Sequence, residues 1–147
     1  MDRQADGEKY FKMGYNCAQS VVLAFKDILG IDEKTAVTLV SGFGGGFGRM
    51  REVCGAVSGM TAVLSALEGY CDPGNDTAKM ELYKKVQALM KEFKEINGSY
   101  ICHELLSLSE GASSPVPEKR TDAYYKKRPC AELVGCACSL LQKHLDK

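Results

Sequence analysis

The stretch that decides the fold runs from Arg51 to Glu68 and reads REVCGAVSGMTAVLSALE. Small residues recur along it at helical spacing, and they are Gly55, Gly59, Ala62 and Ala66. A face of small residues lets another backbone come very close. Cys54 adjoins the start of this face. The stretch therefore predicts a helix in tight contact with a neighbouring helix, with Cys54 placed where the two nearly touch.

The rest of the chain is also dominated by helical patterns. Apolar spacing, caps and stop signals predict helices over residues 2–13, 16–29, 32–40, 77–96, 102–108 and 129–145. Residues 109–121 are rich in Ser, Gly, Pro and charge, which is typical of a surface loop. No stretch alternates as a strand does. We expect an all-α fold, a compact multi-helix bundle with a Gly-rich loop, no significant sheet and a single domain over residues 1–147.

The Gly-rich loop is the segment from Ser41 to Gly48, SGFGGGFG. Because each glycine costs roughly 1 kcal/mol relative to alanine in a helix, this segment predicts no stable helix. It lacks the glycine spacing and the lysine of nucleotide-binding loops, and no strand precedes it. We interpret it as a connection that lets backbones approach closely.

The same loop supplies candidate groups for holding a cofactor or a thiolate. Backbone N–H groups can donate hydrogen bonds to thiolates or to cluster sulfides, and the candidates are Gly44, Gly45 and Gly46. Arg49 and Arg51 flank Cys54 and would stabilise its anion. Ordinary surface charge is the alternative interpretation of both arginines.

Four of the seven cysteines follow helix-start signals, each in a separate segment: Cys17, Cys54, Cys102 and Cys130. A helix start offers free N–H groups and the positive end of the peptide dipole, so a thiol there ionises more easily. The thiolate is the form that attacks, oxidises or binds metal. Taken singly, each of the four is equally well explained as a small apolar core residue. Together they predict a redox or metal site assembled from several helix starts.

The remaining cysteines are less suited to a shared site. Cys136 and Cys138 point about 200° apart on a continuous helix, and Cys130 and Cys138 lie ~12 Å apart along its axis. The last helix therefore supplies one cysteine, unless Gly135 breaks it, and Cys130 is favoured because it has the helix start. Cys71 lies in a turn, and we interpret it as a loop thiol.

Composition excludes several classes of function. The formal net charge is zero, and no strongly basic face suggests binding to nucleic acid. No apolar run approaches the ~20 residues that cross a bilayer, so no membrane contact is expected. The first residues lack the apolar core of a signal peptide, which predicts a cytoplasmic location. Thiols stay reduced there, so the cysteines are expected to be catalytic or metal-binding rather than structural disulfides.

Three motifs together resemble the C_GCAxxG_C_C family of redox-active proteins. They are GYNCAQ from Gly14 to Gln19, GFGGG from Gly42 to Gly46, and CGAVSG from Cys54 to Gly59. The resemblance covers almost the whole chain and implies a small, mostly helical redox protein. It also implies that the family's four characteristic cysteines correspond to Cys17, Cys54, Cys102 and Cys130. The family is related to a domain of split-Soret cytochromes c, but this chain lacks the C-x-x-C-H of covalent haem, so only the iron–sulfur part of that relation transfers.

The functional hypothesis is a redox-active protein whose four cysteines either ligate an iron–sulfur cluster for electron transfer or work as redox dithiols. The cluster is favoured, because no two of the four are close in sequence, and Cys54 is the residue ranked first. Whether the protein is an enzyme stays open. The alternative is a zinc-stabilised helical module that binds a partner, or packing cysteines with no cofactor. We expect a homodimer from the small-residue face, and an electron-transfer protein as partner.

Overall fold

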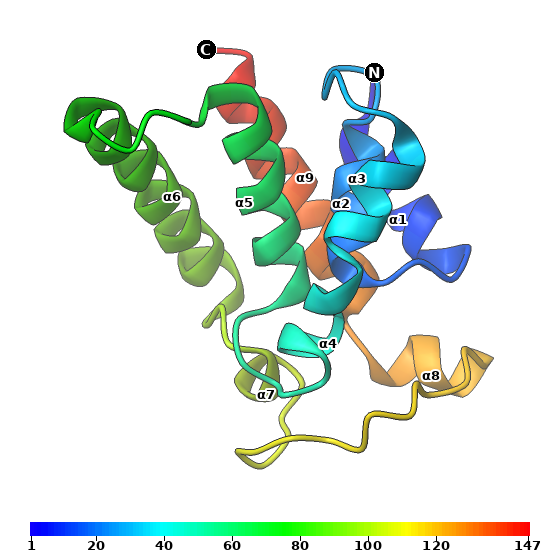
Figure 1. The fold of residues 1–147 in the computed structure, drawn as a ribbon. Helices are drawn as coiled ribbons and strands as arrows, with labels where there is room; N and C mark the ends of the chain where they lie inside the picture. The colour runs from blue at the N-terminus through cyan, green and yellow to red at the C-terminus, as the bar shows by residue number, and fades with distance from the viewer.

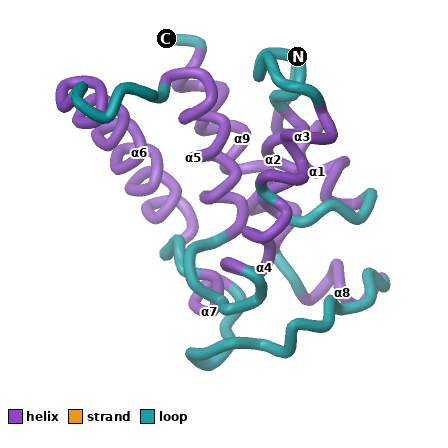
Figure 2. Tube along the Cα trace, viewed as in Figure 1, coloured by secondary structure: helices purple, strands orange, loops and turns teal.

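The computed structural model describes residues 1–147, and regular structure in it is almost entirely helical (Figures 1 and 2). Its elements are α1 (Arg3–Lys12), α2 (Cys17–Ala24), α3 (Glu33–Leu39), a 3₁₀ turn η1 (Ser41–Phe43), α4 (Gly44–Phe47), α5 (Gly55–Glu68), α6 (Asp76–Asn97), α7 (Cys102–Leu105), α8 (Asp122–Lys127) and α9 (Cys130–Leu145). The only β-type pairing is an isolated bridge between Val53 and Ile101. The predicted all-α fold is confirmed. None of the helices has the length and apolar character needed to span a bilayer.

Helices α2, α5 and α9 form the centre and run in the same direction, so that all three begin at one end of the bundle (Figure 1). Helix α1 packs against α2 and α9, and α6 packs against α5 and α9 on the other side. One hydrophobic cluster joins these helices, with Phe11, Phe25, Met60, Phe93 and Leu141 among its fully buried members. Parallel helices need long connections. Here the connection from α2 to α5 contains α3 and the Gly-rich loop, and the connection from α5 to α9 contains α6, α7 and α8.

The close contact predicted for the small-residue face is confirmed, and the neighbour is α2. A Cβ added at Gly59 would lie 2.6 Å from the carbonyl oxygen of Ala18, and one at Gly55 would lie 3.0 Å from Cys17 Cβ. A second close contact was not predicted. Gly7 of α1 meets α9, where an added Cβ would lie 2.6 Å from Cys138 Sγ. The polar character of the first helix concealed this contact.

Helix α2 ends at Ala24, five residues before the expected end. The Arg3 guanidinium donates a hydrogen bond to the carbonyl oxygen of Ala24 (2.8 Å) and forms an ion pair with Asp27. That carbonyl would accept the amide of Ile28 in a continuing helix. The chain turns instead, and the amide of Ile28 donates to the carbonyl of Phe25 (3.1 Å).

Helix α5 begins at Gly55 rather than near Arg51, because the preceding backbone is bonded to another segment. The amide of Cys54 donates to the carbonyl of Tyr100 (2.8 Å), and the amide of Cys102 donates to the carbonyl of Glu52 (2.6 Å). These bonds flank the Val53–Ile101 bridge. They bring the backbones of Cys54 and Cys102 side by side.

The Gly-rich loop forms only short turns, and much of it is left-handed. The φ angles lie between 60° and 72° at Gly45, Gly46, Phe47, Gly48 and Arg49. This conformation suits glycine but costs roughly 1–2 kcal/mol at each other L-residue, here Phe47 and Arg49. The turn folds the loop onto α7, since a Cβ at Gly46 would lie 2.7 Å from that of Cys102.

Candidate thiol site

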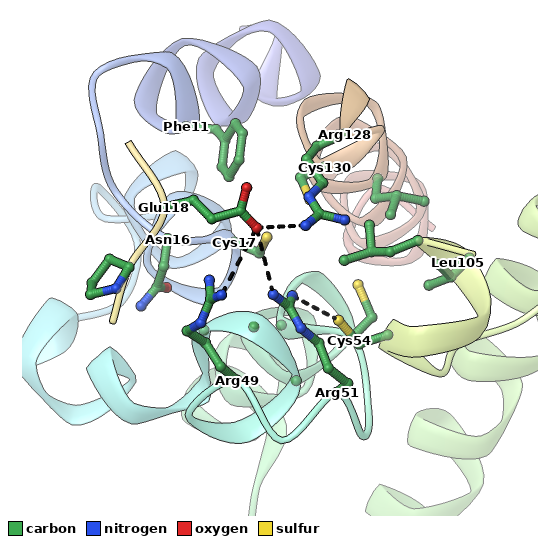
Figure 3. Close-up of a pocket in the computed structure, with 18 of the residues that line it drawn as sticks. Phe11, Asn16, Cys17, Arg49, Arg51, Cys54, Leu105, Glu118, Arg128 and Cys130 are labelled. Carbon is green, nitrogen blue, oxygen red and sulfur yellow. Dashed lines mark hydrogen bonds and ion pairs between the residues drawn. The ribbon is translucent and has the colours of Figure 1, made fainter. Parts of the chain in front are cut away.

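Four cysteines from separate segments line one pocket at the end of the bundle where α2, α5 and α9 begin (Figure 3). Cys17, Cys102 and Cys130 are the first residues of α2, α7 and α9, and Cys54 directly precedes α5. The predicted helix-start positions are therefore confirmed for all four. The structure brings these four side chains to a common pocket of about 210 Å³.

Local sequence fixes the positions of Cys17 and Cys130 at the starts of their helices. Asn16 and Gln19 form a capping box, in which the Gln19 amide donates to Asn16 Oδ1 (2.9 Å) and the Asn16 amide donates to Gln19 Oε1 (3.2 Å). This box starts α2 at Cys17. Pro129 ends the extended backbone at Arg128 and starts α9 at Cys130.

The other three cysteines do not line this pocket. Cys71 is exposed in the turn between α5 and α6. Cys138 is fully buried against α1, while Cys136 on another face of α9 accepts a hydrogen bond from Asn97 Nδ2 (3.4 Å). The prediction that the last helix supplies only one cysteine to the shared pocket is confirmed, and that residue is Cys130.

Cys17 and Cys130 form an interacting pair of unequal thiols. The interaction between the two side chains lowers the pKa of Cys130 and raises that of Cys17 well above its ordinary value. Burial opposes ionisation of Cys130, but the positive charges of Arg128, Arg120 and Arg51 favour it. Cys130 is therefore the more acidic thiol of the pair, and Cys17 the less acidic one.

Cys54 and Cys102 are less acidic. Burial raises the pKa of Cys54 to about 12, although the nearby backbone amides of Ala56 and Val57 oppose the rise. Burial also raises the pKa of Cys102, against the nearby Arg51, whose Nη1 lies 3.6 Å from Cys102 Sγ. Both side chains are thiols at neutral pH.

Arg51 corrects one expectation from the sequence. It was expected to stabilise the anion of its near neighbour Cys54, but its guanidinium contacts Cys102. The reason is the bridge between the two segments, because the carbonyl of Arg51 accepts the amide of His103 (3.2 Å) and so holds Arg51 beside Cys102. Proximity in sequence suggested the wrong partner for Arg51, because the backbone pairing that positions it involves residues about fifty positions away.

The predicted cofactor-binding residues also line the pocket: Gly44, Gly45, Gly46 and Arg49. Sequence reasoning missed Glu118 and Arg120, which come from the segment interpreted as a surface loop. Arg128, which lies in the basic run just before Cys130, also lines the pocket, and its side chain is only 6% exposed. The only signal for Arg128 was its position two residues before Cys130, and the loop composition held none for the other two.

No group of three or more His, Cys, Asp or Glu side chains is arranged so that it could hold a metal ion. The number and type of donors match a zinc or iron–sulfur centre, but their placement does not fit a single ion such as zinc.

The fold and the pocket define an all-helical protein with clustered thiols among arginines. The chain belongs to the C_GCAxxG_C_C family, whose model carries the description "putative redox-active protein" and matches residues 15–144. This confirms the resemblance found in the sequence, and the match includes all four pocket cysteines. No curated protein and no solved structure is significantly similar to the chain.

Proposed function

We propose that the protein is a dithiol–disulfide redox protein in which Cys130 attacks and Cys17 resolves. The observation that carries this proposal is the unequal pair itself. The neighbouring Cys17 lowers the pKa of Cys130, and three arginines act in the same direction. A thiol with a lowered pKa beside a second thiol is the arrangement that thiol–disulfide exchange requires.

The reaction begins when Cys130 Sγ attacks one sulfur of a substrate disulfide. A new bond joins Cys130 to that sulfur, the substrate bond breaks, and the first leaving thiolate takes a proton from water. Cys17 then loses its proton and attacks Cys130 Sγ, so that the second substrate thiolate leaves and takes up that proton. The substrate gains two electrons and becomes two thiols, while Cys17 and Cys130 become a disulfide. An external dithiol protein returns the pair to its reduced form.

Cys54 and Cys102 form the second proposed pair. Their backbones adjoin through the Val53–Ile101 bridge, and both have raised pKa values. Cys54 is for this reason not the attacking thiol in our proposal, although its sequence motif ranked it first. We place the reaction in the cytoplasm, where reducing conditions keep thiols free.

Iron–sulfur electron transfer is the second candidate. One observation favours it, namely that four cysteines line a single cavity, which is the ligand number of common clusters. It ranks second because the unequal acidities of Cys17 and Cys130 point to thiol exchange. A zinc-stabilised module is disfavoured, because the donors are not arranged to hold a single metal ion.

A trapping experiment tests the proposed roles. All proteins carry Cys71→Ser, because this exposed thiol reacts on its own, and the probe is Ellman's disulfide. The parent releases two thionitrobenzoate ions rapidly and forms the Cys17–Cys130 disulfide. Adding Cys17→Ser releases one and traps a mixed disulfide on Cys130, found by peptide mass spectrometry.

The control adds Cys136→Ser, which leaves the pocket intact and must behave as the parent. Adding Cys130→Ser removes the rapid phase. The proposal fails if the protein lacking Cys130 releases thionitrobenzoate as fast as the parent.

A further inference from the structure

Three arginines, two from the connection between α4 and α5 and one from that between α8 and α9, surround a single carboxylate at the pocket (Figure 3). Arg128 Nη2 lies 2.5 Å from Glu118 Oε1 and donates a hydrogen bond to it. Arg49 Nη2 and Arg51 Nη2 lie 3.9 Å and 4.0 Å from the same oxygen. Those two separations exceed hydrogen-bond distance, so Glu118 satisfies one guanidinium and only attracts the other two.

The charges around this carboxylate are unbalanced. The side chains of Arg51 and Arg128 are each 6% exposed, and that of Arg49 is 20% exposed. Three guanidinium groups thus surround a single carboxylate, that of Glu118. Burying uncompensated charge is costly. A further anion would reduce that cost.

Arg49 and Arg51 are held in place by other hydrogen bonds, whereas Glu118 is bonded only to the arginines. Arg49 Nε donates to the carbonyl of Ser114 (2.6 Å), and Arg51 Nε donates to Ser113 Oγ (2.9 Å). Glu118 belongs to the irregular segment between α7 and α8, and its side chain is 34% exposed. Its carboxylate can therefore swing toward solvent while the guanidinium groups of Arg49 and Arg51 stay in place.

We propose that Arg49, Arg51 and Arg128 form a subsite for the anionic group of the substrate, which Glu118 occupies until the substrate displaces it. The identity of the bound molecule rests on the proposed function: it is a disulfide that carries a carboxylate or phosphate group. Guanidinium groups bind both anions through paired N–H donors. The subsite and Cys130 line the same pocket, so a bound anion places the adjoining disulfide near the attacking sulfur.

A matched pair of reagents tests the subsite. Iodoacetate and iodoacetamide alkylate thiolates with the same leaving group but differ in charge. The ratio of their rates at Cys130 cancels any change in the thiolate fraction, because both need the thiolate. All proteins carry Cys71→Ser, and the alkylated residue is identified by mass spectrometry.

Removing the occupying carboxylate favours the anionic reagent. Glu118→Gln raises the iodoacetate to iodoacetamide ratio at least about fivefold, the effect of one unit charge at about 4 Å in water. Arg49→Gln lowers the ratio by a similar factor. Glu33→Gln is the control, since this exposed carboxylate pairs with Lys26 outside the pocket, and it leaves the ratio unchanged.

A second readout needs no thiol chemistry. Sulfate at constant ionic strength raises the melting temperature of the parent, and raises that of Glu118→Gln further. Unchanged reagent ratios in both pocket variants, together with no sulfate effect, overturn the subsite. Failure of the dithiol function is recognised differently: Cys130 of the parent is then unreactive toward iodoacetamide, while the sulfate effect persists.

Discussion

Gly59→Ala tests the helix contact that brings the pocket together. The added Cβ would lie 2.6 Å from the carbonyl oxygen of Ala18 and 3.0 Å from its Cα, both on the backbone of α2. To reach the 3.4 Å at which ordinary contact begins, the two helices must separate by about 0.8 Å. Overpacking at the severe end costs about 3 kcal/mol, and alanine returns about 1 kcal/mol of helix propensity.

The expected net loss is therefore about 2 kcal/mol in the free energy of unfolding, or roughly 4–8 °C in melting temperature for a chain of this size. Urea unfolding of the reduced protein, followed by circular dichroism, measures it. Gly135→Ala is the control. Its Cβ would meet side-chain atoms of Gln4 and Glu8, which can rotate away, so it gains up to about 1 kcal/mol. Equal stability of the two variants would refute the close α2–α5 contact.

Three further predictions follow from the same structure. Protein purified without oxygen should be colourless, with iron, zinc and labile sulfide all below one per chain; a brown, iron-loaded protein would instead support the cluster. Burial raises the pKa of Glu68, but hydrogen bonds from Lys85 and His144 outweigh this and lower it. Glu68→Gln should therefore cost up to about 1 kcal/mol at pH 7, and the difference from the parent should vanish as the pH falls well below 4.5, as titrated unfolding measures. Light scattering should show the homodimer expected from the sequence, and a monomer would refute that expectation. The small-residue face supports a dimer less strongly than the sequence suggested, because Gly55 and Gly59 contact α2 of the same chain.

Features written in local sequence could be predicted. Apolar spacing gave the helical class, and short signals such as Asn16 and Pro129 marked where helices begin. Because each of those signals adjoins a cysteine, the helix-start positions followed. The small-residue face of α5 likewise predicted a close neighbouring helix, but it did not identify that helix as α2.

Features created by tertiary contacts could not be predicted. The bridge at Val53 and Ile101 redirects Arg51 to Cys102, and no local pattern encodes such a pairing. Glu118 is an ordinary loop carboxylate until folding surrounds it with arginines. The order of thiol acidity also depends on burial, which is why Cys54 looked more reactive in the sequence than in the structure.

The pH dependence of alkylation tests the unequal thiol pair most directly. With Cys71→Ser as background, iodoacetamide is applied across a pH series and each modified cysteine is identified by mass spectrometry. Cys130 should react first, with its half-maximal rate below pH 9.0, the ordinary thiol value, because its thiolate forms early. A first reaction at Cys54, or a midpoint for Cys130 at or above 9.0, would contradict the assignment of Cys130 as the attacking sulfur.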